Sequence, residues 1–203
     1  MSKTERSHPL LASRIVRACA CACIVAALSG SNFAAPTAAI APGDTAPALA
    51  ALGLGSPNTT HVRWAEAALT VVNFWATWCA PCRTEMPTLE ALRKENAAPR
   101  LAVVGVLLDL AEDEVALKFA TDLEITYPLL RGTTALSDRW GGIGLMPTTF
   151  LVDSKGIVRR RYVGATPEII DRLKADIATL LESAPSTPVP APGVPAPPKK
   201  PKP

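Results

Sequence analysis

Hydrophobic positions follow two alternating patterns from about residue 44 to residue 183. Short runs of aliphatic and β-branched residues predict buried strands over residues 69–74 and 101–108. Apolar residues spaced three or four apart predict a helix after each strand, over residues 85–96 and 112–123. This part of the chain therefore alternates strand and helix, and its two apolar strands are short enough to lie inside a sheet.

The second half of this region ends in a predicted hairpin. Weaker patterns predict a short strand over residues 125–130 and a helical turn over residues 137–140. Residues 148–153 and 157–163 then form two strand-like runs that flank the tripeptide Ser-Lys-Gly at 154–156. Two such runs around a short glycine-containing connection predict an antiparallel β-hairpin.

A final helix follows the hairpin. Thr166 is suited to cap its N-terminus and Pro167 to occupy its first turn. Its apolar face comprises Ile169, Ile170, Leu173, Ile177, Leu180 and Leu181. The complete order predicts an α/β fold: a mixed central sheet with a parallel core and an antiparallel C-terminal hairpin, covered by helices on both faces.

The N-terminal 39 residues have the features of an export signal. Four basic residues lie within residues 1–17, and an apolar run over residues 18–28 precedes a stretch of small residues. The run is short for a transmembrane helix, but no charge occurs between Arg17 and Asp44, so either a cleaved signal peptide or a signal-anchor fits. We expect a periplasmic or other extracytoplasmic location, secreted or anchored to the inner membrane; an organelle transit peptide is the alternative.

The C-terminal residues 184–203 hold nine of the twenty prolines and are predicted to form a disordered tail. A folded domain is thus expected over residues 40–183. Of the 203 residues, 48% are hydrophobic and 19% charged, which is enough for an ordinary core. The net charge of +3 comes from the two ends, since the segment between them carries 14 basic and 17 acidic residues. A faintly acidic body gives no basis for nucleic-acid binding.

Two cysteines carry the candidate chemistry. Cys19, Cys21 and Cys23 lie inside the apolar run and are interpreted as small hydrophobic residues, which leaves Cys79 and Cys82 for the domain. This pair follows a predicted strand and begins a helix, so the positive helix end favours the thiolate of Cys79 and lowers its pKa. We expect Cys79 to be the attacking thiolate and Cys82, one turn further in, to be the resolving thiol.

A redox role is favoured over two alternatives. A structural disulfide across so short a loop would contribute only about 2 kcal/mol. A metal site would need further ligands, yet the domain offers only His61 and no third cysteine, so no metal and no other cofactor is expected. Trp64, Trp140 and His61 are interpreted as packing or surface residues, and the three arginines at 159–161 as a charged strand edge.

The motif WCAPCRTEMP, preceded by VNFWATW and followed at residues 146–150 by MPTTF, closely resembles the thioredoxin superfamily. Within it, the sequence is similar to the extracytoplasmic TlpA/ResA group of thiol–disulfide oxidoreductases. The resemblance extends over about residues 44–183 and implies a thioredoxin fold with a redox-active Cys79–Cys82 disulfide.

The resemblance also implies roles for residues around the pair. Pro147 matches the family's cis-proline, and the backbone of Met146 would pair with an extended substrate segment. Thr148 follows in the same loop, and Trp78 and Pro81 belong to the motif that faces the substrate. These five residues are therefore expected to bind substrate, and Trp75 to flank the disulfide together with Trp78.

Glu85 is the third residue expected to be catalytic. Thioredoxin has a buried aspartate in the strand before the motif, whereas this chain has Asn73, which does not titrate. Members of the TlpA/ResA group instead place a glutamate three residues after the second cysteine, where this chain has Glu85. A carboxylate buried beneath the thiols would have a raised pKa and could accept the proton of Cys82.

The activity implied is protein-disulfide reduction outside the cytoplasm. The resemblance suggests apocytochrome c, copper-delivery or oxidase proteins as thiol substrates, and a membrane protein as electron donor. Two alternatives stay open: a disulfide-donating oxidase of similar fold, and a metal-binding assembly chaperone. The equilibrium redox potential distinguishes the disulfide-donating oxidase from the reductase. Stoichiometric metal retention by the purified protein tests the metal-chaperone alternative.

Overall fold

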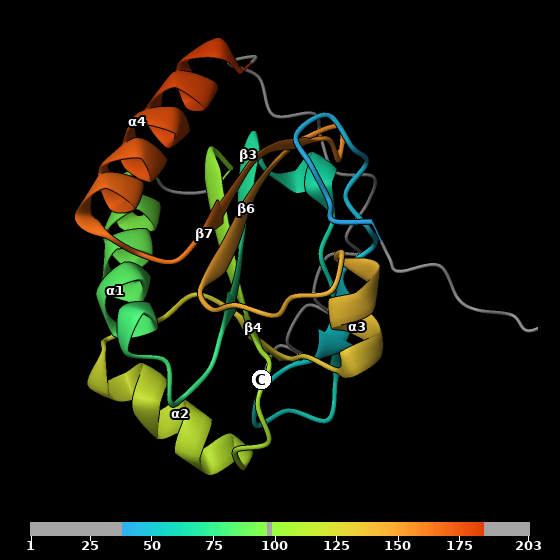
Figure 1. Cartoon of the computed structure of the whole chain (residues 1–203), viewed down its shortest axis with the longest axis vertical. Helices are drawn as coiled ribbons and strands as arrows, with labels where there is room; N and C mark the ends of the chain where they lie inside the picture. Colours follow the sequence, from blue (N-terminus) through green and yellow to red (C-terminus); the bar gives the residue numbers. More distant parts are fainter. Residues whose placement is uncertain (1–37, 97–98, 185–203) are drawn as a thin grey trace, which may run out of the picture. The chain divides into compact units, whose positions relative to one another are not determined.

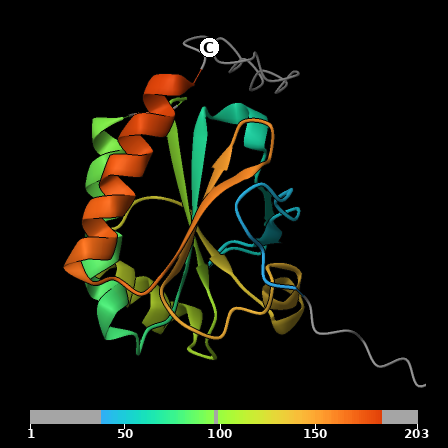
Figure 2. The same cartoon turned by 45° about the horizontal axis from the view of Figure 1, so that its top comes forward.

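The computed structural model describes residues 38–96 and 99–184 and contains one five-stranded sheet (Figures 1 and 2). The strand order is β5-β4-β3-β6-β7. The central strand β3 pairs in parallel with β4 and antiparallel with β6, and β4 pairs in parallel with β5. The strand bounds are β3 Leu69–Trp75, β4 Leu101–Leu107, β5 Leu129–Arg131, β6 Thr148–Asp153 and β7 Val158–Val163.

Helices cover both faces of this sheet. In both views α1, α2 and α4 lie on one side and α3 on the other. One apolar cluster contains Met86 of α1, Phe119 of α2 and Leu173 of α4. Leu136 of α3 belongs to a second cluster. The helix bounds are α1 Ala80–Glu95, α2 Asp113–Asp122, α3 Thr134–Arg139 and α4 Pro167–Ser183. This arrangement of sheet and helices is the predicted thioredoxin fold.

Strand β3 is buried on both faces, and its alternation decides what faces α1. Val71 and Trp75 lie in the cluster beneath α1, whereas Val72 and Phe74 lie in the cluster beneath α3. Successive side chains of a strand point to opposite faces, so Asn73 points toward α1 with Val71 and Trp75. A polar side chain is thereby placed inside the sheet–helix layer, directly upstream of the cysteine pair.

An N-terminal hairpin was not predicted from the sequence. It consists of β1 Ala50–Leu52 and β2 Thr59–His61, and a short 3₁₀ helix, η2 Trp64–Glu66, follows it. The backbone N–H of Leu54 donates to the carbonyl of Leu129 at 2.9 Å, so the hairpin covers the outer edge of β5. Its strands have only three residues each, too few for a hydrophobic period to show in the sequence.

Most predicted elements are confirmed, including the C-terminal hairpin and the capping of α4 by Thr166, whose side chain accepts a hydrogen bond from the N–H of Ile169. Three boundaries were wrong. Helix α1 begins at Ala80 rather than at residue 85, because Cys79 caps it and a proline occupies its first turn. The strand expected over 125–130 covers only Leu129–Arg131, and the turn expected over 137–140 is the α3 helix.

Two predicted segments lie outside the described residues. The export signal is described only at residues 38 and 39, and the proline-rich tail only at residue 184. In the described part of the chain, none of the helices has the length and apolar character needed to cross a membrane.

Candidate active site

The cysteine pair forms the turn between β3 and α1. Cys79 and Cys82 are joined in a disulfide, with 5.3 Å between their Cα atoms. Cys79 is the N-cap of α1, and its Sγ atom accepts a hydrogen bond from the backbone N–H of Cys82 at 3.2 Å. Pro81 occupies the first turn of the helix, where a missing N–H costs no helical hydrogen bond. The sulfur of Cys79 therefore lies at the positive end of the helix dipole.

Both cysteines are closely covered in the disulfide form. Cys79 exposes 2% of its surface and Cys82 none, so the predicted order of exposure holds by a narrow margin. The two tryptophans of the motif differ. Trp75 is fully buried and stacks on Phe119 with 5.2 Å between ring centroids, whereas Trp78 is 70% exposed. Trp75 thus belongs to the core beside the cysteines, and Trp78 forms the accessible apolar surface of the motif.

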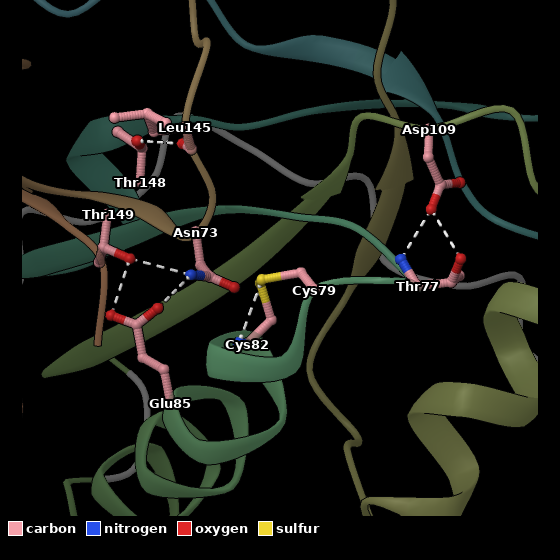
Figure 3. Close-up of a disulfide and its surroundings, with 9 residues drawn as sticks. All are labelled: Asn73, Thr77, Cys79, Cys82, Glu85, Asp109, Leu145, Thr148 and Thr149. Carbon is pink, nitrogen blue, oxygen red and sulfur yellow. Dashed lines mark hydrogen bonds between the residues drawn. A yellow bond between two sulfur atoms is a disulfide. The ribbon is translucent and has the colours of Figure 1, made fainter. Parts of the chain in front are cut away.

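Glu85 is completely buried on α1, one helical turn after Cys82. Its Oε2 atom accepts a hydrogen bond from Asn73 Nδ2 at 2.8 Å, and its Oε1 atom accepts one from Thr149 Oγ1 at 3.0 Å (Figure 3). Burial raises the pKa of Glu85 to about 7, although the hydrogen bonds from Thr149 and Asn73 oppose this rise. A carboxyl group with this pKa both accepts and releases a proton near neutral pH, as expected for a general acid–base residue.

The cis-proline loop lies at the start of β6. The Met146–Pro147 peptide bond is cis, as predicted. The Thr148 hydroxyl donates to the carbonyl of Leu145 at 2.7 Å, and the carbonyl of Pro147 accepts from the N–H of Gly164 at 2.8 Å. These two hydrogen bonds hold the loop on both sides of the cis bond. Leu145, which precedes the predicted substrate-binding residues, is 68% exposed.

Asp109 is a site residue that the sequence reasoning missed. Its carboxylate accepts hydrogen bonds from the backbone N–H and the hydroxyl of Thr77, at 2.6 and 2.8 Å (Figure 3), and from the N–H of Ala111 at 2.9 Å. It thereby ties the loop before Cys79 to the loop after β4. An acidic residue just beyond an apolar parallel strand was the available signal, because the carboxyl ends of parallel strands meet at one edge of a sheet.

The residues interpreted as packing or surface groups take those places. Trp140 is fully buried between Phe74 and Phe150, at centroid distances of 5.4 and 5.0 Å. His61 is exposed on β2, and Arg159 and Arg160 are exposed on the edge strand β7. Across residues 38–96 and 99–184, no three His, Cys, Asp or Glu side chains are grouped closely enough to hold a metal ion.

Comparison with known proteins agrees with this geometry. The model of the AhpC/TSA family matches residues 42–161, which include the cysteine pair, Glu85 and the cis-proline. The chain belongs to the AhpC/TSA family. This AhpC/TSA chain is also similar to individual redox proteins, which confirms the predicted relationship to the ResA group.

Two curated relatives and one solved structure illustrate the similarity. The chain is 36% identical over 111 residues to the thioredoxin-like protein YneN of Bacillus subtilis, covering 54% of this chain and 64% of that protein, which is less than two thirds of its length. It is 32% identical over 155 residues to the thiol-disulfide oxidoreductase ResA of Geobacillus thermodenitrificans, covering 75% of this chain and 83% of that protein. A crystal structure assigned as the thiol:disulfide interchange protein DsbE of Chlorobium tepidum superposes with a TM-score of 0.63 at 29% identity. The match covers 70% of this chain and 99% of that chain.

Proposed function

We propose that this protein is a thiol–disulfide oxidoreductase that reduces protein disulfides outside the cytoplasm. The observation that carries the proposal is the hydrogen bond from the Cys82 N–H to the Cys79 Sγ atom at the tip of α1. An N–H donor and a helix dipole at one sulfur stabilise its thiolate, so Cys79 is the sulfur prepared for nucleophilic attack. The relatives named ResA and DsbE support the same chemistry.

The reaction proceeds in two exchange steps. The thiolate of Cys79 attacks one sulfur of the substrate disulfide, forms a mixed disulfide and releases the other substrate sulfur as a thiolate. Cys82 then loses its proton to the Glu85 carboxylate, and its sulfur attacks Cys79 to form the intramolecular disulfide. The second substrate thiolate leaves, so the substrate gains two electrons and the enzyme loses two. A membrane electron donor would restore the dithiol.

The surface around the pair fits an extended protein segment. Trp78, Leu110 and Leu145 are 70%, 99% and 68% exposed, and each lies on a loop next to the site. Beside the cis-proline, a groove is lined in part by the apolar side chains of Leu108, Leu110, Ile143 and Met146. In this proposal the Met146 backbone pairs with the substrate strand, Pro147 and Thr148 shape the loop, and Trp78 and Pro81 contact the residues that flank the target cysteine.

The redox potential tests the proposed direction of electron flow. Equilibration with glutathione should give a potential near the roughly −270 mV of thioredoxin, and the protein should catalyse the reduction of insulin disulfides by dithiothreitol. A potential near about −120 mV, typical of a strong disulfide oxidant, contradicts the reductant role and favours the disulfide-donating alternative. Stoichiometric copper or zinc in the purified protein that is lost on Cys79→Ser favours the metal-chaperone alternative.

We further propose that residues 1–39 direct export and that the substrates are cysteine disulfides of apocytochromes c or of copper-delivery and oxidase proteins. The basic residues and the apolar run within residues 1–39 support an extracytoplasmic location. Alkaline phosphatase fused after residue 203 should be active in cells producing the full chain and inactive when residues 1–39 are deleted, because this reporter needs disulfides that form outside the cytoplasm. Equal activity without residues 1–39 contradicts the assignment.

A further inference from the structure

Asn73 has one hydrogen-bonding atom that the site does not use. The side chain is completely buried in the central strand β3. Its Nδ2 atom donates to Glu85 Oε2 at 2.8 Å and to Thr149 Oγ1 at 2.9 Å, so both of its hydrogens are bonded. Its Oδ1 atom is equally buried but has no hydrogen-bond donor among the described residues. A buried carbonyl oxygen without a donor is costly, and such an atom in a redox site calls for a functional explanation.

The orientation of the amide follows from its neighbours. An ionised carboxylate only accepts hydrogen bonds, so beside ionised Glu85 the Nδ2 atom faces the carboxylate and the Oδ1 atom faces away from it. Figure 3 shows the Asn73 oxygen pointing toward the sulfur atoms of the pair, with its nitrogen toward Glu85 and Thr149. Neither sulfur of a disulfide carries a hydrogen, so the oxidised pair has nothing to donate to this oxygen. Reduction creates an S–H group on Cys82.

We propose that Asn73 is a positioning residue whose Oδ1 atom accepts a hydrogen bond from the Cys82 thiol in the dithiol form while its Nδ2 atom holds the Glu85 carboxylate. The inference rests on the proposed function and deepens it. One neutral amide then fixes the proton donor and the proton acceptor of the resolving step in a single arrangement. An amide suits this place because it donates and accepts at once and carries no charge that would repel Glu85.

The buried groups Tyr127, Tyr162 and Glu90 do not compete for the thiol proton. Burial raises the pKa values of Tyr127 and Tyr162 above their usual range, so both hydroxyls stay protonated at neutral pH. Glu90 also lies on the buried face of α1, but its carboxylate pairs with Arg93 at 2.7 Å. Glu85 is therefore the carboxylate placed to take the proton from Cys82.

The S–H stretching band of Cys82 tests the hydrogen bond directly. In a Cys79→Ala background Cys82 stays a thiol, and subtracting the infrared spectrum of Cys79→Ala/Cys82→Ala isolates its band from those of the N-terminal cysteines. We expect the band at the lower frequency of a hydrogen-bonded thiol, and a shift to higher frequency when Asn73→Leu is added. Thr149→Val is the matched control: it removes one donor to Glu85 and one acceptor of Asn73 Nδ2 but leaves the Asn73 oxygen and the Asn73–Glu85 hydrogen bond, and it should not move the band.

The equilibrium with glutathione supplies a second readout in the protein that keeps both Cys79 and Cys82. The proposed bond stabilises only the dithiol, so Asn73→Leu should shift the equilibrium toward the disulfide by about fivefold, or about 20 mV for two electrons. A general loss of packing destabilises the dithiol and disulfide forms equally, so it does not change the equilibrium ratio of the two forms. Thr149→Val leaves the Asn73 oxygen in place, so its ratio should stay closer to that of the parent than the ratio of Asn73→Leu does.

The outcomes separate this inference from the proposed function. If the S–H band has the same frequency in Cys79→Ala and in Cys79→Ala/Asn73→Leu, the proposed hydrogen bond is overturned. This holds even if the protein with both cysteines reduces disulfides well. A band that shifts as expected in a protein without reductase activity supports the role of Asn73 and rejects the function. Should Asn73→Leu not fold, Asn73→Ala provides the same comparison with a smaller side chain.

Discussion

A Cys82→Ser variant is expected to accumulate as mixed disulfides with its substrates. Cys79 keeps its place as the N-cap of α1 and still attacks, but the mixed disulfide persists because the second sulfur that would resolve it is missing. Cys79→Ser should capture nothing above background, since the sulfur stabilised as a thiolate at the tip of α1 is then missing. Both variants should lose turnover with insulin. Non-reducing electrophoresis followed by mass spectrometry of the captured partners measures the effect and names the substrates.

The double variant Cys79→Ser/Cys82→Ser serves as the control for capture by the three N-terminal cysteines. Equal capture by Cys79→Ser and Cys82→Ser would contradict the assignment of attacking and resolving sulfurs. Partners that carry the cysteine pair of an apocytochrome c haem site, or cysteines of copper-assembly proteins, would support the proposed substrates. Capture confined to unrelated abundant proteins would count against them.

Glu85→Gln should stabilise the disulfide form above pH 7 by about 3 kcal/mol relative to its effect below pH 4.5. Burial raises the pKa of Glu85 from 4.5 to about 7, so the folded protein binds this proton more tightly than the unfolded chain does. The corresponding stability is fully present below pH 4.5 and is lost as the pH rises through about 7. Glutamine, which cannot ionise, removes this loss.

Urea unfolding of the disulfide form at pH values on both sides of this window measures the difference. The parent should lose stability between pH 4.5 and about 7 relative to Glu85→Gln, and the two curves should run parallel outside that range. A pH-independent difference between them would show that Glu85 has an ordinary pKa. Glu85→Asp is a useful second variant, because it keeps a carboxyl group and should retain a pH dependence that Glu85→Gln lacks.

The fold was predictable where a long element buries a regular face. Strands β3 and β4 are mainly apolar runs, and α4 carries an apolar stripe together with a capping threonine, so each could be recognised locally. The N-terminal hairpin could not, because its strands have three residues each and are held mainly by pairing with each other and with β5. The start of α1 was misplaced because its N-cap is a cysteine rather than one of the usual capping residues.

The site was predictable where its residues belong to the cysteine motif or to the MPTTF stretch at residues 146–150. The pairing of Cys79 with Cys82, the cis bond before Pro147 and the raised pKa of Glu85 all followed from the motif and the resemblance. The position of Asp109 and the contact of Thr149 with Glu85 did not, because both depend on the pairing of β3 with β4 and β6. Long-range partners of this kind depend on strand register, which local patterns leave open.

Three of the exposed apolar side chains, Trp78, Leu110 and Leu145, lie on loops next to the site, whereas Glu85, Asn73 and Thr149 lie inside the helix–sheet layer. Under the proposed function, substrate contacts and the proton transfer of Glu85 thus involve different residues. We expect substitutions of the three loop residues to change which substrates the protein prefers while leaving the proton transfer through Glu85 intact.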